Sequence, residues 1–452
     1  MKYLGEQLWP GQLGHFFILL SFVSSVIATI AYIKSANAKQ LDDANSWKQF
    51  ARVAFGIDLF SVLAVFALLF YIVADHRFEY FYAWNHSEKS LKVKYLLSCI
   101  WEGQEGSFLL WMIWHGVLGM MLIKTARKWE APVMTVVSFA QACLATMVMG
   151  IYFFGTKIGS NPFLTLRELG MLDNAPAFKD IETGALRADY LTLIRDGNGL
   201  NQLLQNYWMV IHPPILFLGF ASTIVPFAFA MAGLWKKDFG GWTKVALPWS
   251  LFSAAIFGTG IMLGAIWAYE SLTFGGYWAW DPVENASLVP WLLLVAGIHT
   301  QVIYSSTGHS LRATYFLFIL SYLLVLYSTY LTRSGDLQDT SVHAFTDLGM
   351  NWQLRIFLLL FILPSLYLFF KNYKKIPHIR KEEETNSREF WMFIGSLVLL
   401  FSGLAIIAMT SVPVFNKLAS FFAGEKRELF KPLALGEDVE FAHNKIQIFV
   451  AI

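Results

Sequence analysis

The sequence predicts an all-α polytopic membrane protein of about ten to eleven transmembrane helices, with a cap (residues 155–209) and an aromatic loop (residues 274–281) on the outer face. Three observations support this fold class. Hydrophobic residues make up 56% of the 452 residues and charged residues only 15%, a balance that ordinary soluble domains do not have. Apolar runs long enough to cross a bilayer recur along the chain. Lys and Arg residues concentrate in alternate short loops.

Ten apolar runs are long enough to span a membrane. They lie at residues 13–33, 53–74, 107–123, 132–154, 210–234, 246–268, 287–304, 313–331, 353–370 and 389–411. An eleventh run begins near Lys445 and the sequence ends inside it, so we expect the chain to be a fragment of a longer protein. The predicted domains are N-terminal membrane helices, the cap, a membrane core and C-terminal helices, at residues 1–154, 155–209, 210–370 and 371–452.

The orientation follows from the basic residues. With the N-terminus outside, the loops at 34–52, 124–131, 235–245 and 371–388 face the cytoplasm and are denser in Lys and Arg than the outer segments. The cap and the aromatic loop are then on the outer face. A net charge of +2 argues against nucleic-acid binding, and the two cysteines are too far apart in the sequence to form a CxxC motif.

The stretch FGGYWAWDPVENASLVPW, residues 274–291, begins with a turn and continues as a helix. Gly275 and Gly276 allow the chain to turn tightly. Asp281 as N-cap, Pro282 as the first helical residue and Glu284 as the third predict a helix that starts with a capping box. The aromatic residues of this stretch are therefore predicted to form a plate at the N-terminal end of a membrane helix.

This plate is formed by Phe274, Tyr277, Trp278, Trp280 and Trp291. The alternative interpretation is an interfacial belt, because Trp and Tyr gather at membrane surfaces. Flat aromatic rings also bind flat aromatic ligands, and the free N–H groups of a helix start favour carboxylates. A porphyrin with two propionates has both features.

Two histidines flank the plate in sequence and are predicted on the outer face. His212 lies in IHPP, where the prolines stiffen the backbone and push the residue before Pro213 toward extended geometry. His343 lies in TSVHAF, after the eighth run. Each can be a structural residue. Together they are candidates for both axial ligands of a haem iron.

His299 lies inside the seventh run, about 27 Å along a straight helix from Asp281. An ionisable residue inside a membrane is a functional candidate, here a ligand of a second haem, although a hydrogen-bonded neutral imidazole is the alternative. Its partner ligand would be His115, His15 or a residue beyond 452. Arg333, after the eighth run, either extends to lipid headgroups or pairs with a propionate.

The segment WEGQEGS, Trp101 to Ser107, precedes the third run on the predicted outer face. Glu102 and Glu105 lie just above the hydrocarbon region. The segment is either a functional element or an interfacial turn with solvated carboxylates.

These residues together resemble a known family. The stretch at 274–291 resembles the tryptophan-rich WWD signature of haem-handling membrane proteins, and the surrounding pattern resembles the CcmF type, the haem lyase subunit of system I cytochrome c maturation. WEGQEGS is similar to that family's W-x-x-HEGS. IHPP at 211–214, GIHT at 297–300 and LTRSG…SVHAF at 331–345 follow in the family's order. The resemblance covers roughly residues 5 to 452.

The resemblance implies specific site residues. His212 and His343 match the outer-face haem ligands, and His299 matches the first intramembrane ligand of a haem b. The family's second intramembrane histidine has no match here. The residues expected to contact haem are Tyr277, Trp278, Trp280, Asp281, Glu284, Asn285, Trp291 and Arg333. Two positions depart from the family pattern, Phe274 in place of Trp and Gln104 in place of His.

The resemblance also implies a function. A haem lyase in a bacterial cell (inner) membrane would take haem from a periplasmic chaperone and promote its thioether attachment to the CxxCH motif of apocytochrome c. Its expected partners are the haem chaperone, apocytochrome c, other maturation subunits, quinol and membrane lipid. One alternative is a haem exporter or haem-chaperone loader that shares the WWD loop. Another is a quinone-linked, proton-moving subunit, for which Asp58 and His299 are the main candidates.

Overall fold

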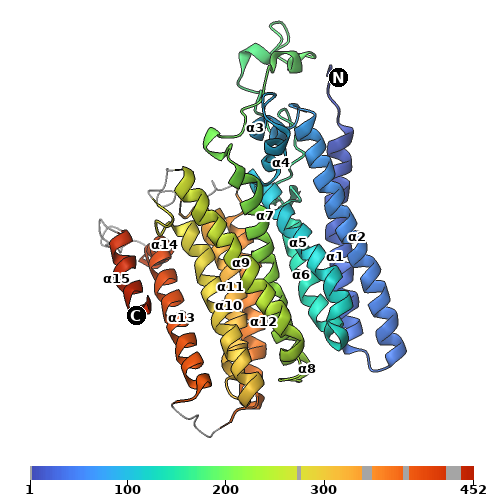
Figure 1. Ribbon diagram of the computed structural model, residues 1–452. Helices are drawn as coiled ribbons and strands as arrows, with labels where there is room; N and C mark the ends of the chain where they lie inside the picture. Colours follow the sequence, from blue (N-terminus) through green and yellow to red (C-terminus); the bar gives the residue numbers. More distant parts are fainter. Residues whose placement is uncertain (1–2, 272–275, 338–348, 380–385, 424–438, 452) are drawn as a thin grey trace. The chain divides into compact units, whose positions relative to one another are not determined.

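The computed structural model describes residues 3–271, 276–337, 349–379, 386–423 and 439–451, which are mostly helical (Figure 1). Ten segments of these residues are long and apolar enough to cross a membrane, and they coincide with the ten predicted runs. This confirms an all-α polytopic membrane protein. The segments are Trp9–Asn37, Leu41–Ala74, Gln104–Thr125, Arg127–Met147, Tyr207–Lys236, Thr243–Ser271, Pro282–Thr307, Leu311–Arg333, Asn351–Lys375 and Arg388–Thr410.

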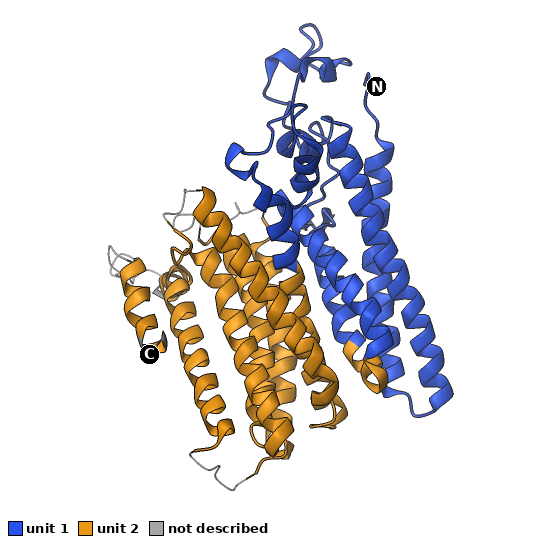
Figure 2. Ribbon diagram, in the orientation of Figure 1, with its two compact units in different colours: residues 1–125, 134–217 blue, residues 126–133, 218–452 orange. Residues whose placement is uncertain are grey.

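The chain divides into two compact units, coloured in Figure 2. Unit 1 comprises residues 1–125 and 134–217, and unit 2 comprises residues 126–133 and 218–452. Unit 1 holds α1 (Trp9–Asn37), α2 (Leu41–Ala74), α3 (Phe81–His86), α4 (Val93–Glu102), α5 (Gln104–Thr125), most of α6 (Glu130–Met147), the strands β1 (Ile151–Phe153) and β2 (Thr156–Ile158), and most of α7 (Tyr207–Ser222).

Unit 2 contains the remaining helices. They are α8 (Ile224–Lys236), α9 (Thr243–Ser271), α10 (Pro282–Thr307), α11 (Leu311–Arg333), α12 (Asn351–Asn372), α13 (Arg388–Thr410), α14 (Val412–Ala423) and α15 (Val439–Ala451). The predicted eleventh run corresponds to α15, which begins at Val439, six residues before Lys445.

The membrane helices of unit 1 approach one another closely through small residues. Helix α2 packs along α1 and also contacts α5. A side chain at Gly119 of α5 would overlap the ring of Phe55, and one at Gly116 would overlap Leu59, both on α2. Small residues at such contacts replace the hydrophobic driving force that is missing between helices in lipid.

The fourth span is shorter than its apolar run. Helix α6 ends at Met147, so the prediction of helix for residues 148–154 is wrong. The chain turns at Gly150, where φ is +59°, and again at Gly155, where φ is +78°, to form the β1–β2 hairpin. Only glycine adopts these angles without strain, so the turn at Gly150 keeps the helix from continuing into the apolar residues that follow, and the turn at Gly155 lies between the two strands.

The cap has its own small core. Leu166, Leu172 and Tyr190 form a buried cluster, and the Tyr190 hydroxyl donates a hydrogen bond to Glu6 Oε1 at 2.7 Å. Burial and the neighbouring Glu6 raise the pKa of Tyr190 well above its ordinary value. The tyrosine thus stays a hydrogen-bond donor, which holds the cap on the residues before α1.

In unit 2, α10 packs against α9, α11 and α13. Val289, Leu293 and Ala296 of α10 form a buried cluster with Leu317 of α11 and Ile406 of α13. This packing fixes the direction in which α10 leaves the aromatic loop.

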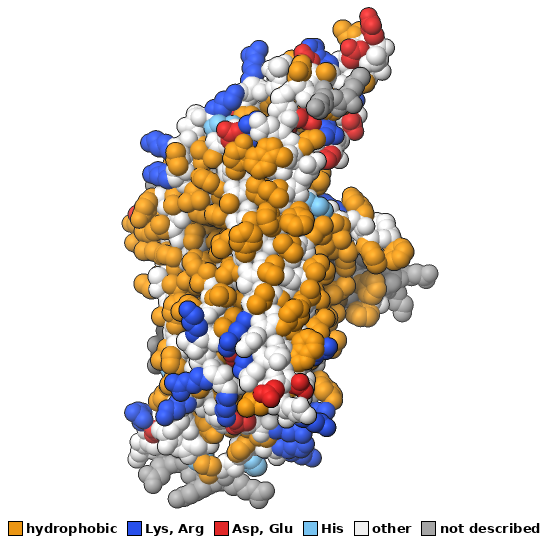
Figure 3. Space-filling view, turned by 90° about the vertical axis from the view of Figure 1, so that its right-hand side faces the viewer, with side chains coloured by type: hydrophobic (Ala, Val, Ile, Leu, Met, Phe, Trp, Pro, Cys, Tyr) orange, Lys and Arg blue, Asp and Glu red, His pale blue; other side chains and the backbone are white. Residues whose placement is uncertain are grey.

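The surface matches a membrane location. On the face shown in Figure 3, hydrophobic side chains cover a broad middle zone, and charged side chains gather toward both ends. Large apolar side chains such as Phe60, Met262 and Leu363 are exposed. A soluble protein would not carry so extensive an apolar surface.

Candidate functional site

Helix α10 begins with the predicted capping box. Asp281 Oδ1 accepts a hydrogen bond from the Val283 N–H at 2.8 Å. Glu284 Oε2 accepts from the N–H groups of Asp281 at 3.1 Å and Ala279 at 3.0 Å. Both carboxylates are therefore used to fold the aromatic loop back onto the helix start.

Trp280 has a left-handed backbone conformation, with φ at +57°. This conformation is unfavourable for a bulky residue and persists only where other contacts impose it. Here Asn285 Nδ2 donates to the Trp280 carbonyl at 2.9 Å and to Thr410 Oγ1 of α13 at 3.1 Å. Asn285, which is 1% exposed, thus ties the strained residue to two helices.

The indole of Trp280 is held by α15. Its ring stacks on the imidazole of His443 with 5.0 Å between ring centroids and 7° between planes. Its Nε1–H donates to Asn444 Oδ1 at 2.8 Å. Trp278 meets the same indole edge-on at 5.9 Å. Sequence reasoning missed His443 and Asn444, and no local signal connects them to a loop some 160 positions earlier.

Tyr277 stacks face to face on Tyr269, at the end of α9, with 4.1 Å between ring centroids. Tyr269 was also missed, although its position just before the loop is a usable signal. The Nε1–H of Trp278 is buried and has no partner among the described residues. Trp291 lies within α10, and its Nε1–H donates to the Ala254 carbonyl of α9 at 2.8 Å. Phe274 lies outside the described residues.

His212 belongs to unit 1 and lies within helix α7. The expectation of an extended backbone before Pro213 is wrong, since α7 continues through both prolines. Pro213 has no N–H to donate to the Met209 carbonyl four residues earlier. The indole Nε1–H of Trp101 donates to that carbonyl instead, at 2.9 Å. This bond replaces the missing helical one and stabilises the turn that carries His212.

The WEGQEGS segment is therefore a structural support for α7. Both carboxylates are half-buried and have protein partners, because Glu102 pairs with His86 and Glu105 Oε1 accepts from Ser160 Oγ at 2.5 Å. Gln104 is 3% exposed, and neither of its side-chain polar atoms has a partner among the described residues.

The remaining predicted iron ligands are only partly described. His343 lies outside the described residues. His299 is half-buried in α10, and its Nδ1 is buried without a partner among the described residues. A buried nitrogen without a partner fits a metal ligand, since such atoms are normally hydrogen-bonded. The two candidate partners belong to unit 1, where His15 interacts with Asn161 and His115 accepts from Trp111.

Arg333 is the last residue of α11 and is 5% exposed. Beside it, Asp336 pairs with Lys417 and accepts from the Tyr330 hydroxyl at 2.5 Å. Burial raises the pKa of Asp336, but the hydrogen bonds from Lys417 and Tyr330 outweigh it and hold the pKa below its ordinary value. The carboxylate is therefore ionised and is held by Lys417 and Tyr330.

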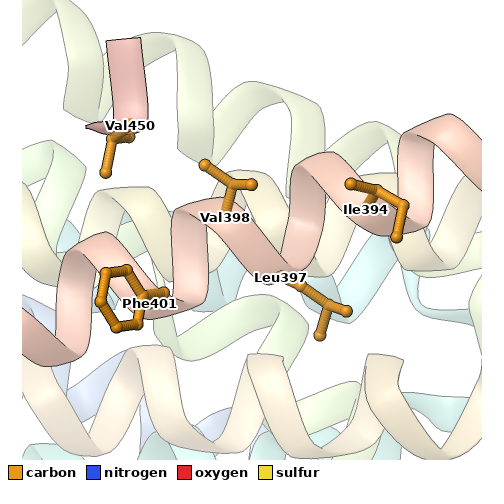
Figure 4. Close-up of a pocket in the computed structure, with 5 residues that line it drawn as sticks. All are labelled: Ile394, Leu397, Val398, Phe401 and Val450. Carbon is orange, nitrogen blue, oxygen red and sulfur yellow. The ribbon is translucent and has the colours of Figure 1, made fainter. Parts of the chain in front are cut away.

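A cavity of about 320 Å³ in unit 2 lies beside α13 (Figure 4). Its lining is entirely apolar, formed by Ile394, Leu397, Val398, Phe401 and Val450. No side chain there binds iron or a carboxylate, so this cavity is not part of the candidate site.

The fold and the aromatic loop define a class, a multi-pass membrane protein that presents an aromatic surface at a helix start. Residues 101–337, which are 237 of the 452 residues, match the family described as "Cytochrome C assembly protein". The chain belongs to this family.

Individual relatives confirm the resemblance to the CcmF type. The chain is 32% identical over 367 residues to "Cytochrome c-type biogenesis protein CcmF" of Haemophilus influenzae, an alignment that covers 79% of this chain and 51% of that protein. The protein of the same name from Pseudomonas fluorescens is 33% identical over 373 residues, covering 81% and 50%.

A solved structure, "Cytochrome c Heme Lyase CcmF", has the same fold, with a TM-score of 0.71 and 21% identity. The similarity covers 100% of this chain and 61% of that one. The chain spans about half the length of the curated relatives it matches.

Proposed function

We propose that this chain is the haem-handling part of a haem lyase in a bacterial inner membrane. It takes haem from a chaperone on the outer face and promotes its thioether attachment to the CxxCH motif of apocytochrome c. The observation that carries this proposal is the aromatic loop. Trp280 is held by Asn285 and by His443 beside the capping box, and Trp278 meets the Trp280 indole edge-on, so the two rings are positioned before any ligand arrives.

In this proposal the haem to be attached is a substrate, and His212 and His343 are its axial ligands. The Trp101 bond to the Met209 carbonyl supports this role for His212, because it fixes the helical turn on which His212 lies. The rings of Tyr277, Trp278 and Trp280 contact the porphyrin. Arg333 pairs with a propionate through its planar guanidinium.

The attachment needs no nucleophile from this chain. Each apocytochrome cysteine thiol adds across one haem vinyl group. The sulfur bonds to the inner vinyl carbon, and the outer vinyl carbon gains a proton, so atoms and electrons balance. The protein contributes position and orientation, which alone account for large accelerations when two reactants are held in contact geometry.

His299 is proposed as one ligand of a resident haem b in unit 2. The unpartnered Nδ1 of His299 supports this assignment. A haem b held there would supply electrons to keep the substrate iron reduced, with quinol as the electron source. The other proposed partners are the haem chaperone and further maturation subunits, and membrane lipid surrounds the spans.

The ligand assignment is tested by purifying the full chain and recording absorption and pyridine haemochrome spectra. His212→Ala and His343→Ala should each lower the outer haem and leave the intramembrane signal unchanged, whereas His299→Ala should do the reverse. His378→Ala is the matched control, since His378 is exposed. Wild-type spectra in both outer variants would remove the assignment.

The lyase activity is tested separately from haem binding. The haem-loaded protein is incubated with a reduced apocytochrome peptide that contains CxxCH, and haem that resists acid extraction is measured. The lyase proposal predicts covalent haem on the peptide and none when both cysteines are serine. Transfer of haem that remains fully extractable would favour the exporter or loader alternative.

A further inference from the structure

A carboxyl group is buried inside unit 1. Asp58 lies near the middle of α2 and is 0% exposed. Ser21 Oγ of α1 donates a hydrogen bond to Asp58 Oδ1 at 2.5 Å. The other carboxyl oxygen, Oδ2, is buried and has no partner among the described residues. An ionisable side chain at this depth in a membrane protein is unfavourable without a specific reason.

Helix α6 adds a second oxygen without a donor. The side-chain amide of Gln141, also 0% exposed, lies within hydrogen-bonding range of the Asp58 carboxyl group. Its Nε2 donates to the Met112 carbonyl of α5 at 3.0 Å, and its Oε1 has no partner among the described residues. Two buried acceptors, Asp58 Oδ2 and Gln141 Oε1, therefore lack a hydrogen-bond donor among the described residues, and each such atom carries a desolvation penalty.

No cation in the described part of the chain balances a charge on Asp58, because it takes part in no ion pair there. The titratable residues on the helices packed against α2 are His15, Tyr32 and Lys34 of α1, Tyr82 and His86 of α3, Lys94, Tyr95, Cys99 and Glu102 of α4, and Glu105, His115 and Lys124 of α5. Helix α6, which carries Gln141, adds Glu130 and Cys143. His115 is fully buried and accepts from the Trp111 indole through Nε2, which makes it a neutral imidazole. An ionised Asp58 would be an isolated anion in the bundle, which is strongly unfavourable in a low-dielectric interior.

We propose that Asp58 is an intramembrane proton-binding site. The carboxyl group is held as a neutral acid whose Oδ2–H donates to Gln141 Oε1, while Oδ1 accepts from Ser21. A single proton then removes the buried charge and gives both acceptors a partner. The ligand is a proton rather than a metal cation, since one carboxylate with one amide oxygen is a poor ligand set for a hard cation. None of these residues belongs to the proposed haem site.

The test is infrared spectroscopy of the purified full chain at neutral pH. We expect the carbonyl stretch of a protonated carboxylic acid, shifted in D₂O, which Asp58→Asn abolishes and Asp43→Asn leaves unchanged. Asp43 is the matched control because it is exposed in the first turn of the same helix. Asp58→Asn should fold normally, because an amide resembles the neutral acid in shape.

A second variant keeps the proposal testable if Asp58→Asn does not fold. Gln141→Leu removes the acceptor and should move the acid carbonyl to higher frequency while the band persists. The proposal is overturned if Asp58→Asn and wild type have the same acid carbonyl region, because Asp58 is then ionised. It is also overturned if sodium ions remove the band, because the site then binds a metal cation.

Discussion

The bond between Trp101 and α7 makes a quantitative prediction. Pro213 leaves the Met209 carbonyl without its helical donor, and the Trp101 indole donates to it at 2.9 Å. Trp101→Phe keeps an aromatic ring but removes the donor. Both Trp101 and Met209 are buried, at 7% and 4% exposed, so water does not readily replace the lost bond.

The size of the effect follows from the unsatisfied carbonyl. A buried acceptor that loses a donor costs about 1–3 kcal/mol, although hydrogen bonds between membrane helices average nearer to about 0.6 kcal/mol. The smaller ring adds a packing loss that is unrelated to the bond. Pro213→Ala separates the cost of the lost hydrogen bond from the packing loss, because alanine restores the N–H that pairs with the Met209 carbonyl. Trp101→Phe should therefore be less destabilising, by about 1 kcal/mol, in the Pro213→Ala background.

The assay is the free energy of unfolding in mixed micelles for the wild type, both single variants and the double variant. Trp114→Phe is the matched control, since the Trp114 indole nitrogen has no partner among the described residues. Its cost should be independent of Pro213→Ala. Because α7 carries His212, Trp101→Phe should also lower the outer haem content. Equal costs of Trp101→Phe in both backgrounds, within about 0.3 kcal/mol, would refute the reasoning.

Three further predictions concern unit 2. Asn285→Ala removes the donor to the Trp280 carbonyl and should destabilise the protein by about 1–3 kcal/mol in the same unfolding assay. An unchanged stability would show that the left-handed conformation of Trp280 does not depend on Asn285. His443→Leu should increase the mobility of the Trp280 indole, measured by fluorescence anisotropy. His443→Phe should leave that mobility as in the wild type, because the ring stack is kept. Equal anisotropies for the two variants would contradict a role for the stack. The pKa of Asp336 lies below its ordinary value of 3.8, so its contribution to stability is full above that value and is lost as pH falls through the lower, folded-state pKa. Thermal unfolding between pH 5 and 2, as an order-of-magnitude window, should therefore show a smaller acid-induced decrease for Asp336→Asn than for wild type, and identical profiles would contradict the role of its bond to Lys417.

Features set by short-range patterns were predictable from the sequence. The ten spans follow from the length of the apolar runs, and the capping box follows from the spacing of Asp281, Pro282 and Glu284. Helix α6 was overestimated because hydropathy does not register the left-handed turn at Gly150. The spans, the capping box and the end of α6 are all set by residues that are close together in the sequence. The first two follow from patterns that the prediction used, whereas the glycine turn was overlooked.

Features that depend on contacts between distant residues were not predictable. The stacking of His443 on Trp280 joins two segments whose sequences do not hint at each other. An extended conformation was wrongly predicted for His212, which is helical, because the preference of a residue before proline was considered alone. The donor that makes α7 tolerate Pro213 comes from Trp101, more than 100 residues earlier in the chain. The IHPP motif could be recognised in the sequence, but its hydrogen-bond partner Trp101 could not.

The central claim is that His212 and His343 bind one haem iron at the aromatic loop. Its most direct test is the electron paramagnetic resonance spectrum of the ferric, haem-loaded chain, with each histidine changed in turn to alanine. We predict a low-spin signal typical of two imidazole ligands, its loss in both His212→Ala and His343→Ala, and its recovery on addition of free imidazole. A low-spin signal of the outer haem that persists unchanged in either variant would contradict the claim.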